Sequence, residues 1–240
     1  MSETRRLRRP TEGGYARGEE TRRKIIDAAI HLFGQRGFAG ASTRDIAARA
    51  GVNAPALQYY FENKEGLYRA CAESFVEEMS ESFGPELERA RAQLECDCNA
   101  DELIEAFIRL LCTVAEMMFK RGDRADKRLF FAREQGGGEP EIGSQVLREH
   151  VREPLNKVAI ALLARITGTR EDDPLTIART LSLYGQFMMF HFARQSALAT
   201  LQWSEIDSEK SAFLRATISE QTRVLLEHWR GEDRRSAPGR

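Results

Sequence analysis

Residues 42–61 read STRDIAARAGVNAPALQYYF, and this stretch predicts two short helices joined by a glycine turn. Ser42 offers a capping hydroxyl and Asp45 a carboxylate three residues later, which is the capping-box pattern at the start of a helix. We expect this helix over residues 43–50. Gly51 follows it at a position where a turn requires positive φ, which glycine adopts without strain.

The second short helix is predicted over residues 54–61. Asn53 is placed to cap it, and Pro55 lies in its first turn, where a missing N–H is harmless. A longer helix is predicted before the pair, over residues 19–36, from apolar residues three and four positions apart (Ile25, Ile26, Ala29, Leu32 and Phe33). Two short helices behind a supporting helix form a helix-turn-helix, whose second short helix enters a groove of DNA.

The remainder of the chain also predicts helices. We expect a fourth helix over residues 64–82, capped by Asn63 and closed by Gly84-Pro85, with a short helical piece possible over 86–94. Further helices are expected near 101–120, 124–134, 140–167, 173–197 and 207–230, separated by glycine, proline or polar breaks. Short alternating runs and Asn-Gly or Asp-Gly hairpin signals are absent from the sequence.

The predicted fold class is therefore all-α, with about nine or ten helices in two parts. A three-helix head with the helix-turn-helix precedes a larger helical domain. We expect a flexible basic arm over residues 1–17, the DNA-binding domain over 18–66, the larger domain over 67–230 and a disordered tail over 231–240.

The charge is unevenly distributed. Residues 1–64 carry 12 Lys and Arg against 7 Asp and Glu, a net charge of +5, whereas residues 65–240 carry 24 against 30, a net charge of −6. A basic head on an acidic body is typical of a separate anion-binding module. A basic disordered tail on a neutral protein is the alternative, because five of the arginines lie within the first 17 residues.

The four cysteines (Cys71, Cys96, Cys98 and Cys112) follow no secretory signal, so we expect reduced, incidental thiols in a cytoplasmic, nucleoid-associated protein. A metal or redox site at Cys96-Asp97-Cys98 is the alternative, although no second ligand pair accompanies it. We expect no metal and no cofactor. Apolar runs long enough to span a membrane are absent, as are the common catalytic motifs of hydrolases, P-loop enzymes and dinucleotide-binding enzymes. The sequence thus argues against an enzyme.

Residues 21–70 resemble the DNA-binding domain of the TetR family of transcriptional regulators, in its AcrR-like form. The matching stretches are IIDAA (25–29), LF (32–33), GF (37–38), STRDIA (42–47), AGV (50–52) and LQYYFENKEGL (57–67). The family often has Tyr at the position of Gln58. A glutamine there bonds a base edge, adenine for preference, which leaves the operator sequence open.

The resemblance implies a set of DNA contacts. Ser42, Thr43 and Arg44 would meet phosphates at a helix N-terminus. Asn53, Ala54, Pro55 and Gln58 would face the major groove, Tyr59 and Tyr60 would touch sugar and phosphate, and Lys64 would anchor another phosphate. Structural roles remain open for three of these residues: Tyr60 as a core residue, Ser42 as a cap alone and Lys64 as a solvated lysine.

The resemblance also implies that the last two long helices pair with those of a second copy. Residues 173–197 and 207–230 carry more large apolar side chains than one buried face needs, unless a single chain buries them all. A ligand pocket is predicted from a methionine- and aromatic-rich set, with an ordinary core as the alternative. Its members are Phe107, Leu111, Met117, Met118, Phe130, Arg133, Tyr184, Phe187, Met188 and His191, with Phe131 beside them.

These expectations describe a sequence-specific DNA-binding regulator. We expect a repressor that binds a pseudo-palindromic operator as a homodimer and is released by a small apolar or amphipathic molecule. The alternatives are a helix-turn-helix protein without small-molecule sensing and a helical enzyme of unknown reaction. For Arg133 the sequence leaves open a charge at the pocket mouth or a surface ion pair.

Overall fold

The computed structural model describes residues 12–119 and 125–236, and over these residues the chain is helical without strands. The elements are α1 (Glu12–Gly40), α2 (Thr43–Ala50), α3 (Ala54–Tyr60), α4 (Lys64–Glu95), α5 (Ala100–Phe119), α6 (Ala125–Gly136), α7 (Glu141–Leu147), the π-helical turn η1 (Arg148–Arg152), α8 (Glu153–Thr167), α9 (Pro174–Phe192), α10 (Arg194–Leu201) and α11 (Ser208–Ser236). The predicted all-α class is confirmed.

The predicted caps of the first short helices are present. The side-chain oxygens of Ser42, Asn53 and Asn63 each accept a hydrogen bond from the backbone N–H three residues later, at 3.1, 2.9 and 2.7 Å. Each bond satisfies one of the N–H groups that the first turn of a helix leaves without an internal partner. Gly51 has φ 70° and ends α2, as its position predicts. Local sequence signals therefore determine where α2, α3 and α4 begin.

The two ends of the chain are more helical than predicted. Helix α1 begins at Glu12, so the flexible arm predicted over residues 1–17 is wrong from that residue onward, and residues 1–11 lie outside the described part. Helix α11 runs to Ser236, so the tail predicted over 231–240 is helical up to that residue, and 237–240 are outside the described part. Gly37 interrupts α1 with φ 71°, close to its predicted end.

Helix α4 continues through Gly84-Pro85, so the predicted closure there is wrong. A proline inside a helix costs roughly 3 kcal/mol. On either side of it, Phe83 and Leu87 are buried, and burial of such side chains contributes roughly 1.5–3 kcal/mol each. Packing against the body therefore offsets the break. The predicted helices 140–167 and 173–197 are instead divided, the first at η1 and the second at Ala193.

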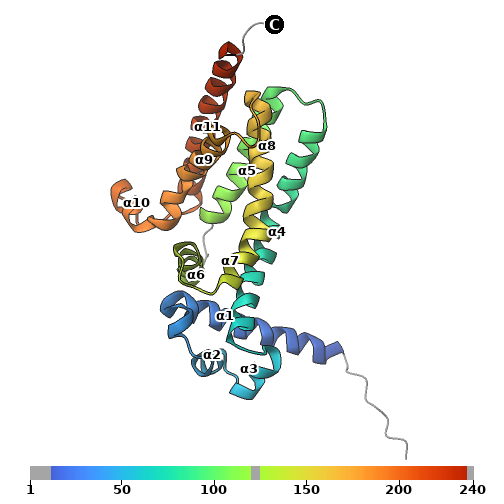
Figure 1. Cartoon of the computed structure of the whole chain (residues 1–240). Coiled ribbons are helices and arrows are strands. Elements are labelled where there is room, and N and C mark those ends of the chain that lie inside the picture. Colours follow the sequence, from blue (N-terminus) through green and yellow to red (C-terminus); the bar gives the residue numbers. More distant parts are fainter. Residues whose placement is uncertain (1–11, 120–124, 237–240) are drawn as a thin grey trace, which may run out of the picture.

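Helices α1–α3 form one end of the molecule, and α4 extends from this head into the body (Figure 1). The body packs α4, α5, α8, α9 and α11 against one another, and its apolar core continues into the head. Helix α6 lies along α1, and α7 packs on α4 at the junction of head and body. The head is therefore fastened to the body by two routes, the continuous helix α4 and the lateral contact of α6 with α1.

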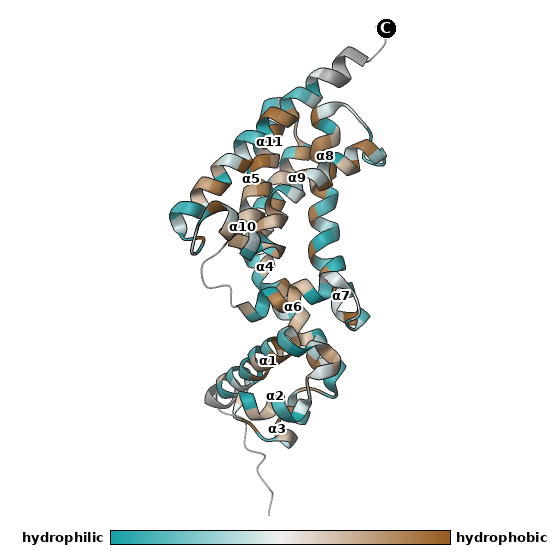
Figure 2. Cartoon of the chain, turned by 90° about the vertical axis from the view of Figure 1, so that its left-hand side faces the viewer, coloured by the Kyte–Doolittle hydropathy of each residue, from teal (hydrophilic) through white to brown (hydrophobic). Residues whose placement is uncertain are grey.

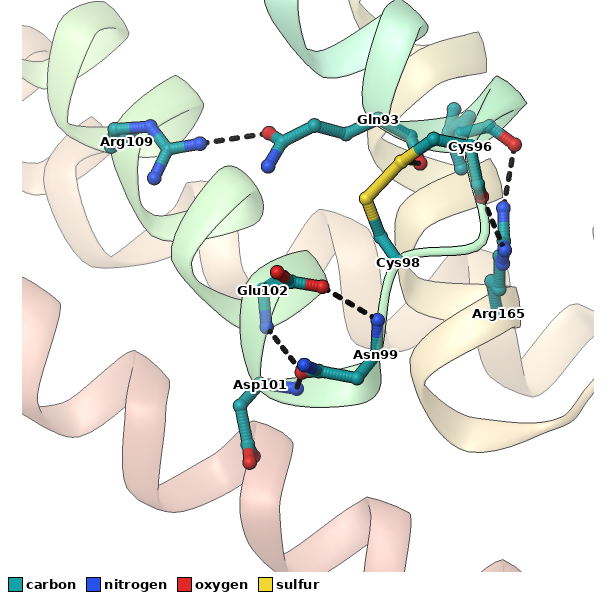
Figure 3. Close-up of a disulfide and its surroundings, with 9 residues drawn as sticks. Gln93, Cys96, Cys98, Asn99, Asp101, Glu102, Arg109 and Arg165 are labelled. Atoms are coloured by element: carbon teal, nitrogen blue, oxygen red, sulfur yellow. Dashed lines mark hydrogen bonds between the residues drawn. A yellow bond between two sulfur atoms is a disulfide. The ribbon is translucent and has the colours of Figure 1, made fainter.

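The connection between α4 and α5 contains a disulfide between Cys96 and Cys98, so the prediction of incidental free thiols is wrong for this pair (Figure 3). Arg165 of α8 donates to two backbone carbonyl oxygens at the end of α4, at 2.5 and 2.7 Å. Asn99 and Glu102 form a reciprocal capping box at the start of α5, with bonds of 3.0 and 2.8 Å. The turn is thus held by neighbours on both sides.

Within the described ranges, no helix is long and apolar enough to cross a bilayer. The same residues hold no group of three or more His, Cys, Asp or Glu side chains arranged to bind a metal ion.

Candidate nucleic-acid interface and ligand cavity

Helix α3 presents a polar edge to solvent while its opposite face is buried. Leu57 and Phe61 are 2% and 6% exposed and hold the helix against α1 and α2. Gln58 is exposed, and Tyr59, at 85% exposure, is the most exposed large apolar side chain in the described part of the chain. Ala54, before them, is exposed as well. A short, rigidly held helix with a free polar edge is the shape that enters a major groove.

The N-terminus of α2 is exposed as well. Ser42, Thr43 and Arg44 are all exposed, so the first backbone N–H groups of α2 are accessible to an anion. Ser42 also caps the helix, and its structural and predicted phosphate-binding roles are compatible, because the cap uses one hydroxyl lone pair. Asp45 does not complete the capping box; its carboxylate lies 3.2 Å from Arg36 Nη1.

The remaining predicted DNA contacts lie at the border between core and surface. Asn53 and Pro55 are exposed at the start of α3. Tyr60 is half-buried, packs against the core and contacts the Tyr59 ring edge-on at 5.2 Å between centroids. The Lys64 ammonium lies 4.4 Å from the centroid of the Phe38 ring. Tyr60 and Lys64 therefore support the head by packing while their polar ends remain near the surface.

Arg133 fastens α6 to the head by bonds that neither predicted interpretation of this residue included, and its Nη1 also lies 3.9 Å from a Glu139 carboxylate oxygen, which is consistent with the predicted ion pair. Its Nε donates to the backbone oxygen of Gly34 at 2.7 Å, and its Nη2 to that of Gln35 at 3.1 Å. Glu139 accepts from the backbone N–H of Phe38 at 2.8 Å. These bonds satisfy backbone groups at the end of α1 with side chains about 100 positions later in the sequence. No local spacing could have indicated them.

A buried polar cluster lies just behind this contact. Tyr68 of α4, 1% exposed, donates a hydrogen bond to Glu134 of α6, and Ser144 of α7 donates to the other carboxylate oxygen at 2.7 Å. Burial and the Glu134 carboxylate raise the pKa of Tyr68. A Cβ on Gly143 would lie 2.6 Å from both Glu134 and Tyr68, so the approach of α7 requires glycine. Because Tyr68 also packs edge-on against Phe33 of α1, the cluster joins the head to three body helices.

The body contains a partly open cavity of about 310 Å³ between α4, α5, α6, α8 and α9. Its lining is mostly methionine, aromatic and aliphatic: Met79, Phe83, Val114, Met117, Met118, Phe131, Val151, Arg152, Leu155, Asn156, Leu181, Tyr184, Gly185, Phe187, Met188 and Phe192. This volume lies at the lower end of the range for small-molecule pockets, and the apolar lining with few polar groups is typical of them.

Half of the predicted pocket residues line this cavity, namely Met117, Met118, Tyr184, Phe187 and Met188. The other five lie elsewhere. Phe107 and Leu111 are each 1% exposed and belong to the core, two turns and one turn before Val114 on α5. Phe130 packs between the rings of Tyr68 and Phe75, Arg133 faces the head, and His191 lies behind the cavity wall. Phe131, adjacent to Phe130, points into the cavity because neighbouring residues of a helix face different directions.

His191 is buried between aromatic rings, with centroid distances of 5.7 Å to Phe131 and 5.0 Å to Phe192. Neither ring nitrogen has a hydrogen-bond partner among the described residues. Burial, assisted by the charges of Arg128 and Arg194, lowers the pKa of His191 to about 4. The imidazole is therefore neutral at pH 7.

This lowered pKa predicts an acid-sensitive body. Between pH 6.5 and about 4 the unfolded chain binds the His191 proton and the folded chain does not, so the free energy of unfolding falls as the pH falls. By pH 5 the loss is about 1–2 kcal/mol. Urea denaturation at pH 7 and pH 5 measures it. His191→Phe is expected to lose less stability over this interval than the wild type, whereas the exposed-site control His228→Gln keeps the wild-type dependence. Equal pH dependence in His191→Phe and wild type would contradict the assignment.

Comparison with known proteins gives consistent results over both parts of the chain. Residues 25–71 match the family model of bacterial regulatory proteins of the tetR family, and residues 100–228 match that of the C-terminal domain of the HTH-type transcriptional dual regulator CecR. CecR of Shigella flexneri is 32% identical over 214 residues, covering 88% of this chain and 93% of the relative. AcrR of Shigella flexneri is 40% identical over 70 residues, covering 29% of this chain and 30% of the relative.

Solved structures share the fold at lower sequence identity. A TetR-family regulator from Bordetella parapertussis 12822 aligns with a TM-score of 0.57 and 20% identity, over 87% of this chain and 94% of that one. AibR, solved with isovaleryl coenzyme A and operator DNA, aligns with a TM-score of 0.57 and 16% identity, over 84% and 97%. Since the C-terminal family model spans more than half of the chain and CecR matches along nearly all of it, this protein belongs to the TetR family of transcriptional regulators and is not an enzyme.

Proposed function

We propose that the chain acts as a homodimer on a pseudo-palindromic operator, and that a small apolar or amphipathic molecule in the body cavity lowers its operator affinity. The observation that carries the DNA-binding part is the exposed edge of α3, where Gln58 and Tyr59 project from a helix held by the buried Leu57 and Phe61. Two such helices related by a two-fold axis would read two half-sites about one DNA turn apart, or a multiple of that.

A gel-shift titration on DNA upstream of the chain's own gene tests this function. Specific binding is expected to weaken steeply with salt, because basic side chains displace counterions from the phosphates; six to ten contacts correspond to a loss of roughly 10³–10⁵ in affinity between 50 and 200 mM salt. Equal affinity for specific and scrambled DNA at every salt concentration would contradict sequence-specific operator binding. We also propose that DNA binding needs no metal or cofactor, so EDTA should leave the titration unchanged.

Repression by occupying a promoter is the mode we propose, in a cytoplasmic protein associated with the nucleoid. The relative CecR is a dual regulator by its description, so the experiment must be able to detect both repression and activation. A reporter behind the operator should rise in a deletion strain if the chain represses and fall if it activates.

Two helices provide the surface that we propose for dimerisation. Helices α9 and α11 contact each other in the body, and apolar segments occur along α11 on the side that faces the viewer in Figure 2. Their exposed large apolar side chains are Leu175, Leu181, Met189 and Phe192 on α9 and Phe213, Val224 and Leu225 on α11. Side chains of this size, 36–60% exposed and gathered on two adjacent helices, indicate an interface. The paired helices of both copies would form a four-helix bundle.

Charge placed in this interface is expected to separate the copies. Phe213 and Val224 are 57% and 60% exposed and lie three helical turns apart on α11. The double variant Phe213→Asp, Val224→Asp should weaken dimerisation by about 100-fold or more, because the core of an apolar interface tolerates unpaired carboxylates poorly. Light scattering after size exclusion measures the mass. The control Tyr59→Asp introduces a carboxylate at an exposed apolar position on the head, and this variant should remain dimeric. A double variant that stays dimeric would rule out this surface.

The cavity and the head are connected by α6, and this connection is the route that we propose for the signal. Phe131 lines the cavity, whereas Arg133, two residues later, binds the end of α1. A ligand that moves α6 or α4 would change the spacing of the two heads, and a shift of about 1–3 kcal/mol changes operator affinity roughly 5–150-fold. If no compound alters operator affinity, the chain is a DNA-binding regulator without small-molecule sensing.

A further inference from the structure

The cavity wall carries positive charge and no negative charge. Of the sixteen described residues that line it, Arg152 alone carries a charge at neutral pH, and none of the others has a carboxylate. Arg152 closes the turn η1 and is half-buried, with its guanidinium carbon 6.0 Å from the centroid of the Phe131 ring, which also lines the cavity. Burial lowers the pKa of Arg152, yet a guanidinium remains protonated in proteins, so the charge persists on the apolar wall.

Two neutral polar groups share the lining with this charge. Asn156 lies one helical turn after Arg152 and offers amide donors. The Tyr184 hydroxyl is buried and has no hydrogen-bond partner among the described residues, and burial raises its pKa, so it keeps its proton and can donate. A buried hydroxyl without a partner costs free energy unless a ligand supplies one. The cavity lining therefore offers hydrogen-bond donors from three side chains.

The surroundings of the cavity favour an anion over a cation. Glu134 acts electrostatically on Arg152 but lies outside the lining, where its two carboxylate oxygens accept hydrogen bonds from Tyr68 and Ser144. Behind the wall, Arg128 and Arg194 act on His191. An ammonium ligand would meet like charge and no carboxylate, whereas a carboxylate or sulfonate would gain charge-assisted hydrogen bonds.

We propose that this cavity binds an amphipathic organic anion, with Arg152 holding its carboxylate or sulfonate and the methionine and phenylalanine side chains enclosing a compact apolar body. The inference deepens the proposed sensing function, on which it rests, by assigning the charge of the effector. It also connects the ligand to the head, because an anion at Arg152 competes with Glu134 for the same cation, and Glu134 is bonded to Tyr68 at the base of α4.

A pair of dyes that differ only in the presence of a sulfonate group tests the proposal on the full-length protein without DNA. The probes are 1-anilinonaphthalene-8-sulfonate and its neutral counterpart N-phenyl-1-naphthylamine, whose fluorescence rises on entering an apolar site. The wild type is expected to bind the sulfonate at least about tenfold more tightly, which is the contribution of one charge-assisted contact. Arg152→Met should remove this preference and leave binding of the neutral dye within about twofold, which also shows that the variant is folded.

Three further variants give the controls. Arg148→Met makes the same change one turn earlier at an exposed position outside the lining and should keep the wild-type preference. Arg152→Lys keeps the charge without the fork of donors and should lie between wild type and Arg152→Met. Met117→Trp places a larger side chain in the cavity and should weaken the binding of both dyes.

The outcomes separate this inference from the proposed function. Equal affinity for both dyes in the wild type, unchanged sulfonate binding in Arg152→Met, or undiminished sulfonate binding in Met117→Trp would each overturn the anion site. None of these results depends on an operator, so a failure to bind or release DNA is recorded separately in the gel-shift titration.

Discussion

The double variant Gln58→Ala, Tyr59→Ala is expected to lose sequence-specific operator binding by at least about 100-fold while folding normally. Both side chains are exposed and neither contributes to the buried core, so their truncation costs little stability. A bidentate bond from a glutamine to a base is worth about 1–3 kcal/mol of discrimination, and the loss of a tyrosine contact to the DNA backbone lowers the affinity further by disturbing the docking of the helix.

Competition gel shifts with specific and scrambled operator DNA measure this loss. The specific affinity should fall to the level of the scrambled sequence, whereas the nonspecific affinity falls much less and its salt dependence changes little, because the basic residues remain. Gln195→Ala removes an exposed glutamine on α10 and should bind as the wild type does. An unaltered ratio of specific to nonspecific affinity in the double variant would exclude α3 as the reading helix.

Gly34→Ala is expected to destabilise the protein by about 1–3 kcal/mol, the usual range for overpacking a close contact, although alanine is the better helix former. A Cβ on Gly34 would lie 2.6 Å from the backbone oxygen of Asp126 and 3.1 Å from the backbone nitrogen of Phe130. Backbone atoms cannot rotate away as a side chain would, so α1 and α6 must separate. This separation would also strain the bonds from Arg133 to Gly34 and Gln35.

Gly84→Ala is the matched control for this substitution. Gly84 is also helical, but a Cβ there would have no atom within 4 Å outside its chain neighbours. The gain in helix propensity is opposed only by the crowding of a residue before Pro85, so alanine should change the free energy of unfolding by less than about 1 kcal/mol. Urea denaturation of both variants measures the difference, and operator binding with and without ligand shows whether Gly34→Ala weakens the coupling of body to head. Similar stabilities for the two variants would contradict the close packing of α6 on α1.

The two glycines show how far sequence reasoning extends in this chain. Helix propensity alone assigns the same cost to Gly34 and Gly84, although the sequence placed the first inside a predicted helix and the second at the end of one. Only the approach of α6, about 90 positions later in the sequence, makes one of them indispensable. The same limit explains the cavity, for which five of ten predicted residues line the wall. Methionines and aromatic residues mark an apolar interior, but their spacing does not distinguish an occupied core from an empty space.

The helix-turn-helix was determined by the sequence alone. Ser42, Asn53, Asn63 and Gly51 act through bonds and backbone angles within three or four residues, so their effects could be predicted before any tertiary contact was known. The exposed edge of α3 follows from the same local pattern, because the buried positions Leu57 and Phe61 leave Gln58 and Tyr59 on the other side.

Tertiary packing alone decided the features through which the body can act on the head. The continuity of α4 through Pro85, the bonds of Arg133 to α1, the cluster of Tyr68 and Glu134, and the charge of Arg152 on an apolar wall all join elements distant in the sequence. The physical reason is the distance along the sequence over which each interaction acts. A cap is satisfied by its own turn, whereas a cavity or an interhelical contact exists only where several helices meet, and their relative placement depends on the sum of many weak packing contacts.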